Sequence, residues 1–267
     1  MPSAVDARNT EVSLPRPPRR IVSLVPSQTE LLAHLGLDET VVGITRFCTR
    51  PVHWHDEKEI VGGTKDIDLD RVRALNPDLI LANHEENTQA DVQTLDTIAP
   101  VFVTQVKTVT EALGMVRTVG RLTDASNHTS TLAGKIISRF SALPDFSSIR
   151  AAYLIWRDPY MTVGGDTFIH DVMSWGGFEN AFGDQSRYPE VSLGTLADAD
   201  LDVVLCGSEP FPFHQDDKFT ADLRKRLSNT PVEIVDGQPF SWYGPRLLDT
   251  PAYLKELRET LPLPHPA

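Results

Sequence analysis

The sequence is poor in cysteine, in long apolar runs and in basic residues. Only two cysteines occur among 267 residues, Cys48 and Cys206, which excludes a disulfide framework and a four-cysteine zinc site. No stretch reaches the roughly 18 consecutive apolar residues of a membrane-spanning helix, so we expect no membrane insertion. The 25 Lys and Arg stand against 37 Asp and Glu, a formal net charge of −12. This charge has the wrong sign for a protein that binds nucleic acid.

The first 20 residues contain neither an apolar run nor a cysteine that could carry a lipid anchor. We therefore expect a cytoplasmic location for the chain as written, or a periplasmic one if an export signal has been removed. Three prolines, Pro15, Pro17 and Pro18, keep this segment extended, and we predict a disordered tail over residues 1–19.

Several common enzyme motifs are also missing. The sequence has no G-x-S-x-G elbow, no glycine-rich loop ending in Lys-Ser or Lys-Thr, and no H-E-x-x-H. These absences argue against a hydrolase of that type, a P-loop nucleotidase and a zinc protease, and we predict that the chain is not an enzyme. One thiol keeps an enzyme alternative open, because Cys48 lies near Arg46 and Arg50, which could lower its pKa.

What the sequence does contain is an alternation of short apolar strands and helices that occurs twice. It predicts strands over residues 21–25, 41–44, 79–82, 101–103, 152–156, 201–205 and 231–235. Helices are expected between them, the first capped by Ser27 or Thr29 and one in the second half capped by Asp166. Residues 201–205 align with 77–81 at an offset of 124, which also places Glu209 on Glu85. The pattern favours two similar α/β lobes with parallel sheets.

The segment between the two halves has no strand pattern. From Val109 to about Leu143 the apolar residues recur at helical spacing, with a break near residues 124–127. We therefore predict two α/β lobes with central parallel sheets, joined by a helical connector that permits small motions, with a ligand cleft between the lobes. The expected boundaries are a tail over 1–19, a first lobe over 20–107, connecting helices over 108–146 and a second lobe over 147–267.

Ligands of open α/β sheets collect beyond the carboxyl ends of the strands. The loops expected there are rich in Arg, Trp, Tyr and Phe, which suit a large, partly planar ligand. The alternative for Trp156, Phe213 and Trp242 is that they belong to the core. We predict ligand contacts by Ser27, Gln28, Phe47, Arg50, Lys65, Asn83, His84, Glu85, Trp156, Arg157, Tyr160, Arg187, Tyr188, Glu209, Phe211, Trp242, Tyr243 and Arg246.

The densest polar run after a predicted strand is residues 83–87. His84 could supply an axial nitrogen to a metal, with a carboxylate orienting it. The alternative is that Glu85 and Glu86 begin a helix, where negative charge is favourable. A second histidine pair, His53 and His55, is too small for a metal site on its own.

An ordered set of motifs resembles one known family. Residues 20–30 (RIVSLVPSQTE), Gly62-Gly63, residues 76–80 (NPDLI) and Gly176-Gly177 with Asn180 are similar to the helical-backbone metal receptors. These include the cobalamin-binding and ferric-siderophore-binding proteins of ABC importers. The resemblance covers residues 20–261 and implies two Rossmann-like lobes, a helical backbone and a metal chelate held between the lobes.

The resemblance also identifies departures from the family pattern. In the cobalamin importer's receptor an acid on each lobe pairs with permease arginines. The first acid matches Asp70, whereas the second falls near Gly194, where this chain has no acid, which argues against docking through that pair. Two corrin-packing tryptophans match Thr64 and Asn83. Aromatic character is kept at Phe47, Tyr188 and Trp242.

Together these features predict a monomeric, non-catalytic receptor for a metal chelate, with a corrinoid such as cobalamin first, then haem or a ferric siderophore. It would deliver the chelate to an ABC importer or act as a cytoplasmic binder, with no covalently bound cofactor. One alternative is a cytoplasmic enzyme of chelate metabolism that uses Cys48, His84 and Glu209. The other is a receptor for a free metal ion held by His84, Glu85 and Glu209.

Overall fold

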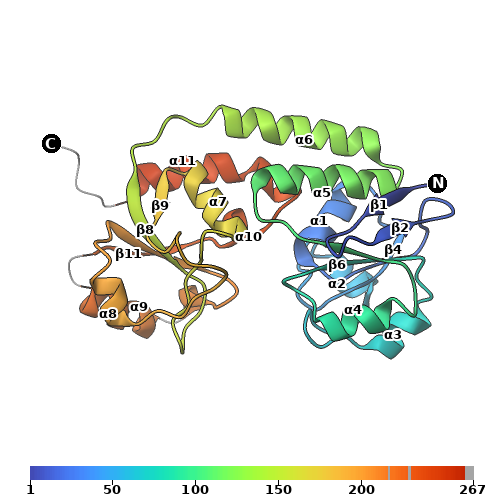
Figure 1. The fold of residues 1–267 in the computed structure, drawn as a ribbon, viewed down its shortest axis with the longest axis horizontal. Coiled ribbons are helices and arrows are strands. Elements are labelled where there is room, and N and C mark those ends of the chain that lie inside the picture. The colour runs from blue at the N-terminus through green and yellow to red at the C-terminus, as the bar shows by residue number, and fades with distance from the viewer. Residues whose placement is uncertain (216, 228–229, 262–267) are drawn as a thin grey trace. The chain divides into compact units, whose positions relative to one another are not determined.

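The computed structural model describes residues 1–215, 217–227 and 230–261, which fold into two compact units (Figure 1). Both units are discontinuous in sequence. Unit 1 comprises Met1–Val106, Thr110–Ile136 and Tyr243–Pro245, and unit 2 comprises Lys107–Val109, Ile137–Trp242 and the chain from Arg246 onward. The segment 108–146, which we expected to stand apart as a connector, is thus shared between the units.

Unit 1 is built on a sheet of five parallel strands in the order β5-β4-β3-β6-β7. Their short apolar sequences are buried on both faces, as parallel strands covered by helices require. All the strands predicted for the first half are present, and β5 is an addition. The strands are β3 (Ile21–Ser23), β4 (Val41–Ile44), β5 (Glu59–Ile60), β6 (Leu79–Asn83) and β7 (Val101–Thr104).

The helices of unit 1 follow these strands. Asp68 and Thr88 cap α3 and α4 by accepting hydrogen bonds from Arg71 N at 3.0 Å and Asp91 N at 3.1 Å. The predicted cap of the first helix by Ser27 or Thr29 is wrong. Pro26 occupies the first position of the helix, and the Thr29 hydroxyl bonds to Val25 O and Ser23. The helices are α1 (Pro26–His34), α2 (Trp54–Glu57), α3 (Leu69–Ala74) and α4 (Gln89–Leu95).

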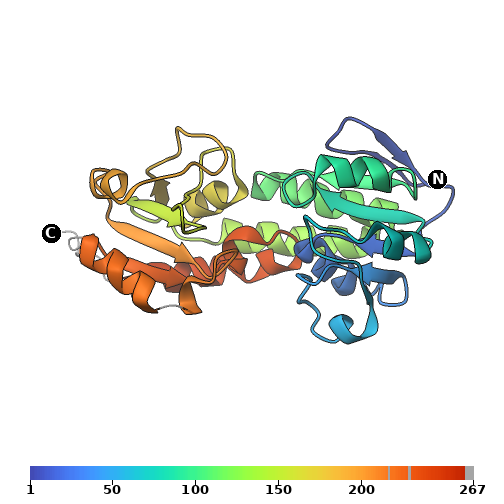
Figure 2. The ribbon, with the colours of Figure 1, turned by 90° about the horizontal axis from the view of Figure 1, so that it is seen from below.

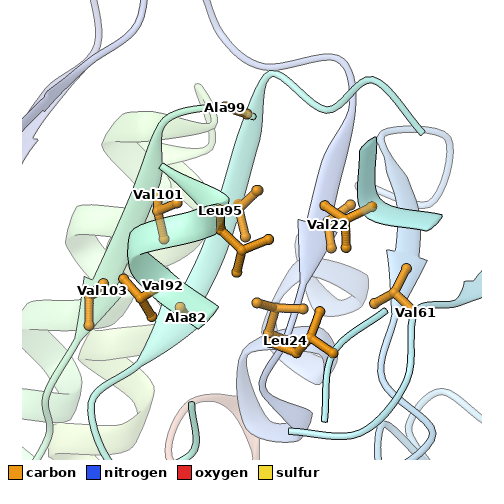
Figure 3. Close-up of a cluster of buried hydrophobic side chains, with 12 residues drawn as sticks. Val22, Leu24, Val61, Ala82, Val92, Leu95, Ala99, Val101 and Val103 are labelled. Carbon is orange, nitrogen blue, oxygen red and sulfur yellow. The ribbon is translucent and has the colours of Figure 1, made fainter. Parts of the chain in front are cut away.

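A core of apolar side chains lies between α4 and the sheet of unit 1 (Figure 3). Val92 and Leu95 project from α4 toward Ala82 of β6 and Val101 of β7, and all four are buried. Burial of such side chains contributes about 1.5–3 kcal/mol each for the larger ones. This packing holds the carboxyl ends of β6 and β7 in place.

Residues 1–14 form a folded hairpin, so the predicted disordered tail over 1–19 is wrong. Strands β1 (Ser3–Val5) and β2 (Glu11–Ser13) pair antiparallel. Ala7 N donates to Val103 O at 2.8 Å, which attaches the hairpin to β7, the edge strand of the sheet. The prolines that suggested disorder lie after the hairpin, where they impose an extended backbone without preventing the order of the residues before them.

Unit 2 repeats the topology of unit 1 in a four-stranded parallel sheet. Its order β11-β10-β8-β9 matches β7-β6-β3-β4, and β6 and β10 begin at the predicted offset of 124 residues. The prediction of two similar α/β halves is therefore confirmed. The strands are β8 (Ile149–Leu154), β9 (Phe178–Asn180), β10 (Val203–Gly207) and β11 (Val232–Val235).

The helices of unit 2 cover this sheet, and α9 packs beside the edge strand β11 (orange in Figure 2). Leu223 of α9 and Leu227, which follows the helix, belong to the buried core there. Thr167, not the predicted Asp166, caps α7 by accepting from His170 N at 3.3 Å. Asp166 accepts from Arg187 N at 2.5 Å instead. The helices are α7 (Phe168–Trp175), α8 (Leu193–Ala197), α9 (Asp217–Arg226), α10 (Gln238–Ser241) and α11 (Thr250–Thr260), with short 3-10 turns at Phe213–Gln215 and Pro245–Leu248.

The two predicted connecting helices are present as α5 (Val109–Leu122) and α6 (Ser126–Ser141). Their periodic apolar residues are buried, apart from Ile137, which is 44% exposed. The division between the units falls inside α6, after Ile136. Within the described ranges, none of the helices is both long and apolar enough to traverse a lipid bilayer.

Candidate functional site

The strand order of unit 1 identifies where a ligand is expected. From β3 the chain winds one way through β4 and β5 and then the other way through β6 and β7. Ligands of open α/β sheets bind outside the carboxyl ends of the strands at such a switch point. The residues at this place are Ser27 and Gln28, at the start of α1, and Asn83, the last residue of β6.

A buried hydrogen-bond network joins these residues. Gln28 Nε2 donates to Thr104 Oγ1 at 2.5 Å, and Asn83 Nδ2 donates to the same oxygen at 3.1 Å and to the Tyr243 hydroxyl at 2.8 Å. Tyr243 also bonds to the side chain of Ser27. Burial raises the pKa of Tyr243, so its hydroxyl stays protonated and able to donate. The structure thus brings four predicted residues together and adds Thr104, the carboxyl-terminal residue of β7.

One acceptor of this network has no partner. Gln28 is fully buried, and its Oε1 lacks a hydrogen bond within the described part of the chain. A buried amide oxygen without a donor costs about 1–3 kcal/mol. The network therefore contains one buried acceptor whose hydrogen bond is not made within the described residues.

The remaining loops at this edge of unit 1 are tied to one another. Arg46 pairs with Asp66 at 2.5 Å, and Lys65 Nζ donates to Glu85 O at 2.6 Å. Phe47 is 51% exposed, with the Arg46 guanidinium 5.2 Å from its ring centroid. Of the predicted residues, Arg50 is exposed and Phe47, Lys65 and Glu85 lie in these loops, outside the buried network.

The structure gives little support to the predicted metal roles. His84 is exposed, its backbone N–H bonds to Thr104 O at 2.9 Å, and His53 and His55 are exposed at α2. Among the described residues, no group of three or more His, Cys, Asp or Glu is arranged to hold a metal ion. The free-metal alternative through His84, Glu85 and Glu209 is therefore not supported.

In unit 2 the corresponding place, at the carboxyl ends of β8 and β10, is aromatic. Trp156 is 41% exposed and packs edge-on against Phe211, with ring centroids 5.6 Å apart. Phe211 in turn packs against the buried Phe213 at 4.7 Å, and Tyr160 packs on the same core. The core alternative is correct for Phe213 and also describes Trp242, of which only 7% is exposed, whereas Trp156 keeps an exposed ring.

A second cluster in unit 2 contains Glu209, Ser241 and Trp242. Glu209 Oε1 accepts from Trp242 Nε1 at 2.6 Å and from Ser241 Oγ at 2.8 Å. Burial raises the pKa of the Glu209 carboxyl, and hydrogen bonds with Ser241, Trp242 and Gln238 oppose the increase. Arg246 lies over the Trp242 ring at 6.0 Å. Glu209, Trp242 and Arg246 were predicted as separate ligand contacts, whereas Ser241 and the contacts among these residues were not predicted.

The other predicted residues of unit 2 lie in nearby loops of that unit. Arg157 Nε is 3.8 Å from Asp158 Oδ2. The guanidinium of Arg187 lies 5.3 Å from the ring centroid of Tyr188, and both side chains are half-buried. The ligand contacts of Arg157, Arg187 and Tyr188 therefore stay predictions.

The pKa of Glu209 gives a test of this cluster. Because burial raises that pKa above its ordinary value of 4.5, the folded protein binds the proton more tightly than the unfolded chain does. The resulting stabilisation is fully present below pH 4.5 and is lost as the pH rises through the raised pKa. We expect the wild-type free energy of unfolding, relative to that of Glu209→Gln, to fall across this range. Urea unfolding at several pH values measures it, and a pH-independent difference would contradict the assignment.

Both thiols are expected to be inert in the folded protein. Cys48 and Cys206 are fully buried, burial raises the pKa of Cys48, and burial raises that of Cys206 to about 12. Arg46 pairs with Asp66 instead of lowering the pKa of Cys48. Iodoacetamide at pH 8 should label neither cysteine before unfolding and both afterwards, as intact mass spectrometry would show. Rapid labelling of native Cys48 would revive the enzyme alternative, in which that thiol is reactive.

Comparison with known proteins identifies the family. The family described as periplasmic binding protein matches residues 21–232. This chain belongs to that family. That family consists of substrate-binding proteins, and the family resemblance predicted from the sequence is confirmed.

Two curated relatives are informative. The cobalamin-binding protein of Halobacterium salinarum is 32% identical over 215 residues, which cover 76% of this chain and 57% of the relative. The match therefore spans little more than half of that relative's length. The vitamin B12-binding protein of Pectobacterium carotovorum is 27% identical over 239 residues, covering 86% of this chain and 85% of the relative.

Solved structures share the fold. The periplasmic vitamin B12-binding protein of Vibrio cholerae has a TM-score of 0.73 at 21% identity, covering 92% of this chain and 99% of its own. A periplasmic heme-binding protein of Roseiflexus has a TM-score of 0.77 at 18% identity, covering 90% and 99%. These likenesses confirm the two-lobe α/β fold of this family member.

Proposed function

We propose that this chain binds a metal chelate at the carboxyl ends of the central strands of its sheets, with a corrinoid such as cobalamin preferred over haem or a ferric siderophore. The names of the relatives support this choice. The observation that carries it is the exposed ring of Trp156 beside Phe211, because aromatic faces exposed at a switch point suit a large, flat ligand.

The polar network of unit 1 supports a ligand that carries hydrogen-bond donors at its rim. The free oxygen of Gln28 requires a donor, and the Tyr243 hydroxyl is the adjacent polar group. A corrinoid presents amide N–H groups at its rim, whereas the rim acids of haem ionise and are then only acceptors. This chemistry favours the corrinoid over haem.

Delivery to an ABC importer is the second part of the proposal, with Asp70 as the docking acid. The Asp70 side chain is 93% exposed and pairs with Arg73 at 2.7 Å. The alternative is a binder that acts without a permease, and it is kept because Gly194, which is exposed on α8, stands where the resemblance expects the second docking acid. Delivery and permease-independent binding are distinguished by adding the purified protein to a reconstituted corrinoid importer. The importer's ATP hydrolysis is then measured.

The binding proposal is tested on the full chain by titration with cyanocobalamin, haemin and a ferric siderophore. We expect saturable quenching of tryptophan fluorescence with cyanocobalamin, and a corrinoid mass on freshly purified protein in native mass spectrometry. Tighter binding of haemin would correct the ligand, and binding of none of the three would contradict the proposal. Trp175→Ala is the control variant, because the Trp175 ring packs against Phe140 and takes part in neither cluster.

A further inference from the structure

The carboxylate of Glu209 is hydrogen-bonded to the indole of Trp242 and to Ser241. Trp242 Nε1 donates to Glu209 Oε1 at 2.6 Å, and Ser241 Oγ donates to the same oxygen at 2.8 Å. Charged acceptors make shorter and stronger hydrogen bonds than neutral ones. Oε1 thus accepts two protein donors, and the side chain of Gln238 also hydrogen-bonds to the carboxyl group, so most of its acceptor capacity is used within the protein.

The backbone around Glu209 is packed so that this carboxylate has little room to move. A Cβ atom at Gly237, just before α10, would lie 2.7 Å from Glu209 Cγ and 3.1 Å from Glu209 N. Gly237 N also donates to Ser208 Oγ at 3.0 Å. The end of β10 and the segment leading to Trp242 are thereby held against each other.

The indole of Trp242 is restrained at its edge and over its ring. Glu209 holds the N–H edge, and the Arg246 guanidinium lies 6.0 Å from the ring centroid, within the range of a cation–π contact. Only 7% of Trp242 is exposed. A ring that is fixed before binding loses less conformational entropy when a ligand packs against it.

We propose that Glu209 is a positioning residue, which fixes the orientation of the Trp242 indole for packing against a flat chelate and does not itself contact the ligand. This rests on the proposed function, in which Trp242 is a ligand contact. The ligand class it serves is a planar macrocycle, which is recognised by its face. The sequence analysis predicted Glu209 as a ligand contact. Its hydrogen-bond partners indicate instead that it acts on the ligand through Trp242.

The test follows the indole N–H directly in the full chain. In a ¹H–¹⁵N spectrum the Trp242 indole cross-peak, assigned by its loss in Trp242→Phe, should shift upfield in Glu209→Gln and exchange faster with solvent in Glu209→Ala. With cyanocobalamin as the probe, Glu209→Ala should raise the dissociation constant at least fivefold. Glu209→Gln, whose amide oxygen still accepts from the indole, should recover most of the affinity. Glu256→Ala, an exposed acid on α11, is the matched control.

The outcomes separate this inference from the proposed function. An indole cross-peak that is the same in wild type, Glu209→Gln and Glu209→Ala shows that the hydrogen bond is not made and overturns the inference. So does a shifted cross-peak with cyanocobalamin affinity unchanged in Glu209→Ala. If the wild type binds neither cyanocobalamin nor haemin, the proposed function fails, and the positioning role fails with it even where the cross-peak shifts. If Glu209→Ala does not fold, Glu209→Gln decides: an unshifted cross-peak overturns the inference and an upfield shift with most of the affinity kept supports it.

Discussion

Replacing Trp242 with alanine is expected to weaken chelate binding by more than about 1 kcal/mol, roughly a fivefold increase in the dissociation constant. The indole donates to Glu209, which follows the carboxyl end of β10, and Arg246 lies over its ring. Truncation removes both the aromatic surface and the partner of the Glu209 carboxylate. Titration of wild type and Trp242→Ala with cyanocobalamin measures the change.

Two further variants make this result specific. Trp175→Ala also removes a tryptophan from unit 2, and it should leave the dissociation constant unchanged because Trp175 packs on Phe140. Trp242→Phe keeps a flat ring but loses the N–H donor, so its affinity should lie between those of wild type and Trp242→Ala. Because Trp242 is largely buried, circular dichroism must first show that each variant is folded. An unaltered dissociation constant in Trp242→Ala would remove this residue from the site.

Replacing Asp6 with alanine is expected to lower the free energy of unfolding by about 3 kcal/mol. Asp6 is 6% exposed and its carboxylate accepts from Arg8 N at 2.9 Å, Arg8 Nε at 2.7 Å, Thr10 N at 3.1 Å and Val103 N at 3.3 Å. Alanine would leave buried backbone N–H groups without an acceptor at the place where the hairpin meets β7. Urea unfolding at pH 7 measures the loss.

The matched control is Asp96→Ala. Asp96 also pairs with Arg8, at 2.5 Å, but its side chain is 41% exposed, and exposed pairs contribute about 0–1 kcal/mol. A small effect of Asp96→Ala beside a large effect of Asp6→Ala would show that the carboxylate under the hairpin carries the attachment. Equal and small effects would mean that the hairpin adds little to the stability of the unit.

The repeated architecture could be predicted from the sequence because buried parallel strands are short apolar runs and amphipathic helices have a period of 3.6 residues. Both signals are local. The hairpin was missed because its strands are only three residues long and its stability comes from Asp6 and β7, far apart in sequence. The helix caps at Val25 and Thr167 were missed because two or three residues at each helix start had suitable side chains.

The candidate site was predictable in its location but not in its internal contacts. The rule that ligands bind at the carboxyl ends of parallel strands led to Gln28, Asn83 and Glu209. That rule could not show that Thr104 Oγ1 accepts hydrogen bonds from the amides of Gln28 and Asn83, or that Glu209 accepts one from Trp242. Such pairings depend on packing between segments as much as 160 residues apart, as for Asn83 and Tyr243.

The assignment of Tyr243–Pro245 to unit 1, within a stretch otherwise in unit 2, has a consequence for dissecting the protein. A gene fragment that stops at Ile136 would encode every strand of the first sheet and still deprive the Asn83 amide of its phenol acceptor. The first half should therefore not reconstitute its native polar interior when it is produced alone as one uninterrupted piece. Fragment complementation would need the three residues supplied in trans, for example as a short peptide spanning them.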